Sequence, residues 1–144
     1  MSIEELQKKL KENGYKITSQ RKAILEVLID YQDHFISAEK LFNKVKIKNS
    51  KVNLSTIYRN LDILNSLDFV HKITINDDYS LFSLVSLDEH HHHIICKCCG
   101  KTEVIPFCPF DDLKAFAEEK GFDLTQHKIE LYGYCKDCKH KNKL

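Results

Sequence analysis

The sequence has no tryptophan, one methionine, two prolines and only four glycines, and no apolar run is long enough to span a membrane. The N-terminus does not resemble a secretory signal. We therefore expect a cytoplasmic protein with no membrane partner. The scarcity of glycine also disfavours the glycine-rich loops that many ligand-binding and catalytic clefts contain.

Neither sign of charge is in excess, because the formal net charge is +1. Overall charge therefore excludes no class of partner. Charge is uneven locally, since residues 40–59 contain six cations and no acid. Such a segment is typical of a nucleic-acid-binding face, although a solvated lysine-rich helix surface would give the same pattern.

Cysteine is absent from residues 1–85, and all six cysteines follow Asp88, together with most of the histidines. This shift in composition predicts two modules, residues 1–85 and residues 86–144. Because thiols stay reduced in the cytoplasm, the cysteines are interpreted as metal ligands or redox centres rather than as disulfides.

The first module predicts four helices followed by a β-hairpin. Apolar residues recur at helical spacing, residues 69–75 and 79–85 are strand-like, and residues 76–78 form a turn signal. Helices followed by a two-stranded wing predict a winged helix-turn-helix, in which the helix before the wing enters the major groove. The residues that mark helix starts or ends are Gly14, Thr18, Ser37 and Ser55.

The helix expected before the wing has polar residues beside its apolar stripe. Arg59 can reach phosphate or guanine, Asn60 can pair with adenine, and Tyr58 can contact phosphate or a thymine methyl. Thr56 lies off the stripe as well. Ordinary surface residues are the alternative, but the wing that follows favours DNA.

The second module predicts a mixture of strands and one helix. Residues 94–96, 103–105 and 128–134 are strand-like, and residues 111–119 have helical spacing with Gly121 just past their end. The fold class expected for the whole chain is therefore α+β.

Two cysteine pairs, Cys96-x-x-Cys99 and Cys135-x-x-Cys138, have the spacing of zinc knuckles. Two such pairs supply the four thiolates of a tetrahedral structural zinc site. A redox CxxC is the rival interpretation, but one pair would be enough for it, and no thioredoxin-like βαβ pattern begins near either pair. The remaining cysteines, Cys98 and Cys108, have no clear partner.

Four consecutive histidines precede the first knuckle. In a strand, successive side chains alternate between faces, so His91 and His93 point one way while His90 and His92 point the other. One run can therefore serve two metal sites, and sites rich in nitrogen and carboxylate suit zinc, ferrous iron, manganese or nickel. The residues that could complete them are His34, His127, Glu89, Glu103 and Asp111.

Five segments occur in an order and spacing that match one protein family. They are GYKIT followed by QR from Gly14 to Arg21, HFISAEKL from His34, STIYRNL from Ser55, HHHHIICKCCGK from His90 and HKIELYGYCKDC from His127. On these segments the chain resembles the ferric-uptake-regulator (Fur) family of metal-dependent bacterial repressors, and the likeness covers nearly all of it.

The resemblance implies an N-terminal winged helix-turn-helix domain and a C-terminal α/β dimerisation domain. It implies a homodimer that binds double-stranded palindromic operator DNA and represses metal-uptake genes, with Zn²⁺ at a structural site and Zn²⁺ or Fe²⁺ at a regulatory site. An iron- or peroxide-responsive regulator of the same family is the alternative.

The resemblance also implies roles for particular residues. Lys16 matches a lysine that reaches the minor groove, and a regulatory hinge site ties the two modules together. Taken together with the patterns above, the expected DNA-binding set is Lys16, Arg21, Thr56, Tyr58, Arg59 and Asn60; the structural zinc set is Cys96, Cys99, Cys135 and Cys138; the hinge set is His34, His91 and His93, with Glu103 as the nearby carboxylate; the set of a second metal site is His90, His92, Asp111 and His127.

The chain departs from the family pattern at the hinge. Ser83 and Val104 stand where the family often has ligands, usually carboxylates. The peroxide-sensing branch needs those carboxylates around ferrous iron, whereas a histidine-dominated site suits zinc. The stretch CGKTEVIPFCP also looks like the zinc-uptake branch. Zinc is therefore favoured over iron.

Two other classes of protein would use some of the same residues. A zinc-dependent enzyme could use His90, His92 and His127 with an open water position, and a thiol redox enzyme could use one cysteine pair. A metal-storage protein would not need the wing or the polar helix before it. We expect no enzymatic activity.

Overall fold

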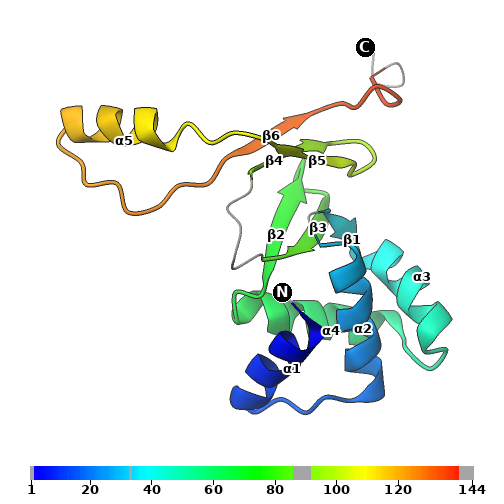
Figure 1. The fold of residues 1–144 in the computed structure, drawn as a ribbon. Coiled ribbons are helices and arrows are strands. Elements are labelled where there is room, and N and C mark those ends of the chain that lie inside the picture. The colour runs from blue at the N-terminus through cyan, green and yellow to red at the C-terminus, as the bar shows by residue number, and fades with distance from the viewer. Residues whose placement is uncertain (1, 33, 86–91, 140–144) are drawn as a thin grey trace. The chain divides into compact units, whose positions relative to one another are not determined.

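The computed structural model describes residues 2–32, 34–85 and 92–139 (Figure 1). The chain divides into two compact units, Met1–Glu89 and His90–Leu144, called unit 1 and unit 2 below. Each is described by itself. Within the described residues, no helix is long and apolar enough to cross a membrane.

Unit 1 contains helices followed by a β-hairpin, as the sequence pattern predicts. A short strand that the pattern did not predict precedes the third helix and pairs with the hairpin, which gives a sheet of order β1-β3-β2. The elements are α1 (Ile3–Glu12), α2 (Ser19–Asp30), β1 (Ile36–Ser37), α3 (Ala38–Lys48), α4 (Leu54–Ser66), β2 (Val70–Ile75) and β3 (Tyr79–Leu84).

Side-chain caps fix the starts of these helices. Thr18 and Ser37 cap α2 and α3 as predicted, because each side chain accepts a hydrogen bond from a backbone N–H of the first turn. The predicted cap of α4 was wrong. Asn53, rather than Ser55, accepts the N–H of Thr56 at 2.9 Å, so α4 begins at Leu54.

The core of unit 1 lies between its helices and one face of the hairpin. Leu6, Ile24, Leu41 and Leu61 are fully buried, one from each helix, and Phe82 of β3 packs against the same cluster. This burial orients α4, since its apolar stripe faces inward and its exposed residues, among them Tyr58 and Arg59, face outward. The winged helix-turn-helix expected from the sequence is therefore the observed fold of unit 1.

Unit 2 is built on a sheet of order β5-β4-β6. The neighbours β4 (His92–Cys96) and β5 (Thr102–Ile105) are antiparallel, whereas β4 and β6 (Glu130–Gly133) are parallel. The chain passes through α5 (Phe110–Glu119) between β5 and β6, and Gly121 takes a positive φ of 81° just after α5. The α+β class predicted from the sequence is confirmed.

Candidate metal centres and nucleic-acid interface

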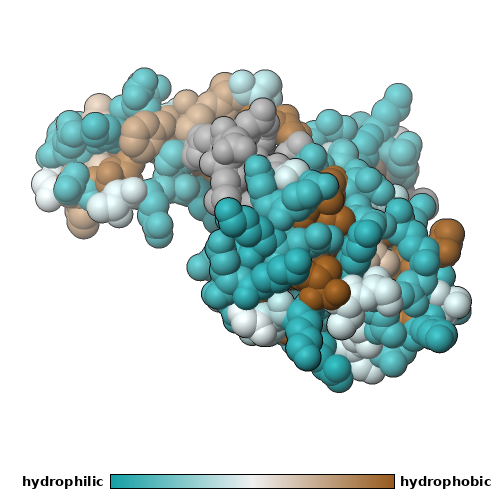
Figure 2. All heavy atoms as spheres, turned by 60° about the horizontal axis from the view of Figure 1, so that its bottom comes forward, coloured by the Kyte–Doolittle hydropathy of each residue, from teal (hydrophilic) through white to brown (hydrophobic). Residues whose placement is uncertain are grey.

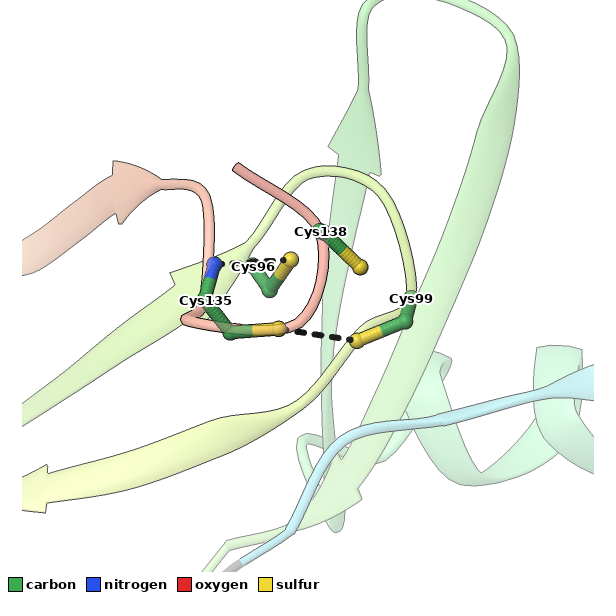
Figure 3. A group of neighbouring side chains, drawn as sticks. All are labelled: Cys96, Cys99, Cys135 and Cys138. Carbon is green, nitrogen blue, oxygen red and sulfur yellow. Dashed lines mark hydrogen bonds between the residues drawn. The ribbon is translucent and has the colours of Figure 1, made fainter. Parts of the chain in front are cut away.

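The four knuckle cysteines meet at one end of the sheet of unit 2 (Figure 3). Cys96 is the last residue of β4, and Cys99 lies in the turn that follows it. The parallel pairing of β4 with β6 brings Cys135 and Cys138 beside them. All four sulfur atoms lie within 4.8 Å of one another, so the cluster can surround a single tetrahedral ion.

Backbone hydrogen bonds stabilise the ionised form of one cysteine in this cluster. Burial raises the pKa of the Cys96 thiol, but hydrogen bonds from the backbone N–H groups of Cys135, Cys99 and Cys98 lower it, and the resulting pKa is about 6. The N–H of Cys135 lies 3.3 Å from that sulfur. Burial raises the pKa of Cys99, whose sulfur is 3.7 Å from that of Cys135. Four crowded thiols need a cation to ionise together, and Zn²⁺ fits the donor set.

Cys98 stands outside the cluster although it lies between two of its members. Its side chain is exposed, and its thiol contacts that of Cys138, which raises the pKa of Cys138. Cys98 therefore lies beside the four cysteines that surround the centre but is not one of them.

Among the described residues, a second group of metal-type side chains lies in unit 2. The Nε2 atoms of His92 and His127 are 3.2 Å apart, and each lies 3.1 Å from the sulfur of Cys108. His92 is buried, and the other two are partly buried. The centroid of the Phe110 ring lies 5.0 Å from that of the His127 ring.

This group differs from the predicted second site in one ligand. The structure brings His92 and His127 together as predicted, while His90 lies outside the described residues. Asp111 is exposed in the first turn of α5 and is not in the cluster, so its role as a ligand stays a prediction. Cys108 joins the two histidines because the chain turns toward them before α5 begins.

Sequence reasoning left Cys108 without a partner. The feature that would have indicated a partner is the register of the β4–β5 pair, in which Ile105 pairs with His92. A residue shortly after Ile105 then lies near His92. The predicted strand began at residue 94, so His92 was not expected to pair with this part of the chain.

The hinge set remains a prediction. His34 is exposed in unit 1 and His93 is partly buried in unit 2, while His91 lies outside the described residues. His93 pairs with Val104 across β4 and β5, so Glu103 lies on the opposite face of the sheet from His93. We therefore do not retain Glu103 as a partner of His93.

The outward face of α4 carries candidate DNA contacts. Arg59 is exposed, and Tyr58 is 41% exposed. The hydroxyl of Tyr58 donates to Glu39 Oε1 at 3.0 Å, and this bond raises the pKa of Tyr58. Lys16 is exposed in the loop before α2. In the view of Figure 2 the surface is mostly hydrophilic, with apolar side chains only in small groups.

Asn60 has a different role from the predicted contact with adenine. It is 5% exposed, and its Oδ1 accepts from Nε of Arg21 at 2.7 Å. Its amide nitrogen donates to the carbonyl of Thr56, and Nη1 of Arg21 donates to the carbonyl of Lys16 at 2.6 Å. Arg21 and Asn60 therefore join the Lys16 loop to α4, and Asn60 is not presented to a base.

Comparison with known proteins gives consistent results. The model of the ferric uptake regulator family matches residues 12–132. The chain is 33% identical to the peroxide-responsive repressor PerR of Staphylococcus epidermidis over 140 residues, which cover 96% of this chain and 91% of that protein. It is 32% identical to the ferric uptake regulation protein of Bacillus subtilis over 142 residues, covering 96% and 95%. The Vibrio cholerae ferric uptake regulator superposes with a TM-score of 0.76 at 31% identity, covering 90% of this chain and 99% of that one.

Proposed function

The chain belongs to the ferric uptake regulator family, and from that premise we propose that it is a zinc-responsive repressor of metal-uptake genes in the cytoplasm. As a member of this family it is a metal-responsive, dimeric, DNA-binding transcription regulator and not an enzyme. In this proposal, unit 1 reads the operator and unit 2 carries the dimer contact and the metals.

The donor atoms of unit 2 are the observation that favours zinc. The described clusters offer sulfur and imidazole nitrogen and no carboxylate. Manganese prefers oxygen ligands, whereas thiolate and imidazole suit zinc. Val104, on the same face of the sheet as His93, has no ligand atom in its side chain, and the buried Ser83 of β3 has a hydroxyl and no carboxylate.

The four-cysteine site fits a structural ion, because a closed set of four thiolates leaves no position for exchange. Regulation then depends on histidine-containing sites, for which the hinge residues His34, His91 and His93 are our candidates. A metal increases operator affinity only if it binds the DNA-competent arrangement more tightly than the alternatives. Couplings of this kind are typically about 1–3 kcal/mol, or roughly 5–150-fold in affinity.

The DNA-binding role of α4 is tested by two neighbouring residues. Arg59→Ala should weaken operator binding by about 1–3 kcal/mol, because an exposed arginine on the recognition helix loses its contact with base or phosphate. Its free energy of unfolding should change by no more than about 0.5 kcal/mol. Fluorescence anisotropy at fixed salt, with an operator selected from a random duplex library, measures the first effect, and urea denaturation measures the second.

Asn60→Ala is the matched comparison on the same helix. It should lower the free energy of unfolding by about 1–3 kcal/mol, because the Nε of Arg21 loses a buried partner. If Arg59→Ala leaves operator affinity unchanged, or if Asn60→Ala leaves stability unchanged, the roles given to the two residues are wrong.

A further inference from the structure

A tyrosine on the outer face of α4 is hydrogen-bonded to a carboxylate on α3. The hydroxyl of Tyr58 donates to Oε1 of Glu39 at 3.0 Å. Both side chains reach the surface, since Glu39 is exposed and Tyr58 is 41% exposed. The two residues are 19 positions apart in the sequence, so the packing of α3 against α4 brings them together.

The core of unit 1 holds the backbone under this pair. Ala38, next to Glu39, is 2% exposed, and Ile57, next to Tyr58, is fully buried. Ser37 caps α3, because its hydroxyl accepts a backbone N–H of the first turn. Two held backbones and one formed hydrogen bond leave little to be ordered when DNA arrives, which lowers the entropic cost of a contact made by this pair.

The hydrogen bond assigns the single proton of the tyrosine hydroxyl to Glu39. It also raises the pKa of Tyr58, so the hydroxyl keeps this proton at neutral pH. Hydrogen bonds to a carboxylate are roughly twice as strong as those between neutral groups, so neutral acceptors on DNA compete poorly for the proton. The oxygen of Tyr58 and both oxygens of Glu39 can then only accept. The pair therefore presents acceptors, and no donor, to DNA.

Such a pair is a poor partner for phosphate, whose oxygens are acceptors and carry negative charge. Among the residues that the structure describes, no ion pair neutralises Glu39. In a helix-turn-helix the helix before the recognition helix crosses the DNA backbone, and α3 has that place in unit 1. A carboxylate there weakens binding to DNA of any sequence, so a phosphate contact does not explain the pair.

Base edges in the major groove differ in what they offer to two acceptors. Guanine presents two acceptors there, and thymine presents an acceptor and a methyl group. Cytosine and adenine each present an exocyclic amino group, which donates. Glutamate is a characteristic partner of the cytosine amino group. The hydrogen-bonding pattern of the pair therefore matches cytosine or adenine and rejects guanine.

We infer that Glu39 and Tyr58 together recognise the exocyclic amino group of one cytosine or adenine in each half-site of the operator. Glu39 determines this specificity twice, because it accepts from the base and also holds the proton of Tyr58, so that the hydroxyl oxygen accepts as well. The inference rests on the proposed function, in which α4 enters the major groove.

Selection from a random duplex library with the full, zinc-loaded chain tests this inference. The unaltered chain should prefer cytosine or adenine at one position of each half-site. Glu39→Gln introduces an amide that donates, and Tyr58→Phe removes the hydroxyl. Each variant should lose the preference at that position by about 5-fold or more and keep the preferences elsewhere. Glu39→Gln should also bind unselected DNA more tightly, because a negative charge near phosphate is removed.

Glu12→Gln is the matched control, since it neutralises an exposed carboxylate at the end of α1. It should keep the full base preference of the unaltered chain. Both test variants nearly conserve side-chain size at exposed positions, and urea denaturation checks that each is folded.

Base analogues test the amino group directly and distinguish the two bases. An adenine at the selected position is replaced with 2-aminopurine, whose amino group lies in the minor groove, and a cytosine with 2-pyrimidinone, which lacks the group. The analogue should weaken binding of the unaltered chain and leave binding of the double variant Glu39→Ala/Tyr58→Phe nearly unchanged. Comparing two proteins on the same duplexes cancels any effect of the analogue on the duplex itself.

The inference is overturned if Glu39→Gln and Tyr58→Phe keep the base preference of the unaltered chain, or if the analogue without the amino group binds as tightly as the natural base. It is also overturned if Tyr58→Phe weakens binding to all sequences equally, which would indicate a phosphate contact. If Arg59→Ala still weakens operator binding in these cases, the proposed function stands and this inference alone fails. A zinc-loaded chain that selects no operator would contradict both.

Discussion

Cys135→Ser should lose the structural zinc and the dimer. The thiol of Cys135 lies 3.7 Å from that of Cys99, and the backbone nitrogen of Cys135 lies 3.3 Å from the sulfur of Cys96. Cys135 therefore contributes both a thiol ligand and a backbone hydrogen bond to the site. Binding of a structural zinc by four such ligands contributes about 10–16 kcal/mol in small zinc domains. Losing one thiolate removes much of this stabilisation. Metal analysis after dialysis against a chelator, together with sedimentation, measures both losses.

Cys98→Ser is the matched control for this prediction. Cys98 is not one of the four clustered cysteines, so the variant should retain both zinc and the dimer. A Cys135→Ser protein that keeps its zinc after dialysis would refute the four-cysteine site. Loss of zinc from Cys98→Ser as well would mean that the ligand set is wrong.

The double variant His34→Ala/His93→Ala should bind the operator equally weakly with and without added zinc. This expectation follows from the hinge set, in which the two histidines hold the regulatory ion. The loss should equal the whole metal-dependent gain of the unaltered chain, roughly 5–150-fold. Operator anisotropy with buffered free zinc measures it, and metal analysis should still find the four-cysteine zinc.

His71→Ala provides the control for histidine removal. His71 is exposed on β2 and belongs to neither predicted histidine site, so its variant should keep the response to zinc. If the double variant responds to zinc as the unaltered chain does, the regulatory ion binds elsewhere, and the hinge set must be abandoned.

Features that depend on local sequence could be predicted well. Thr18 and Ser37 cap their helices because a short hydroxyl side chain before an apolar stripe satisfies free N–H groups. The turn between β2 and β3 follows from Asn76 and Asp77, which adopt positive φ values of 52° and 55°. The cap of α4 was missed because Asn53 and Ser55 are both good caps, and local preference does not decide between them.

Features that depend on distant partners could not be predicted. Asn60 looks like a base contact in the sequence, and its burial depends on Arg21, which lies 39 residues away along the chain. Cys108 joins two histidines only because the β4–β5 register and the return from α5 bring them together. The family resemblance implied Asp111 instead. A resemblance assigns roles by position in the sequence, and it does not show how this chain folds around His92 and His127.

The most direct test of zinc-dependent repression is operator affinity measured against buffered free zinc at constant salt, with the four-cysteine site filled throughout. Affinity should rise by roughly 5–150-fold between chelated and zinc-saturated protein, and Mn²⁺ at the same free concentration should produce a smaller rise. An affinity that is the same at every zinc concentration, or that is highest in the chelator, would contradict it.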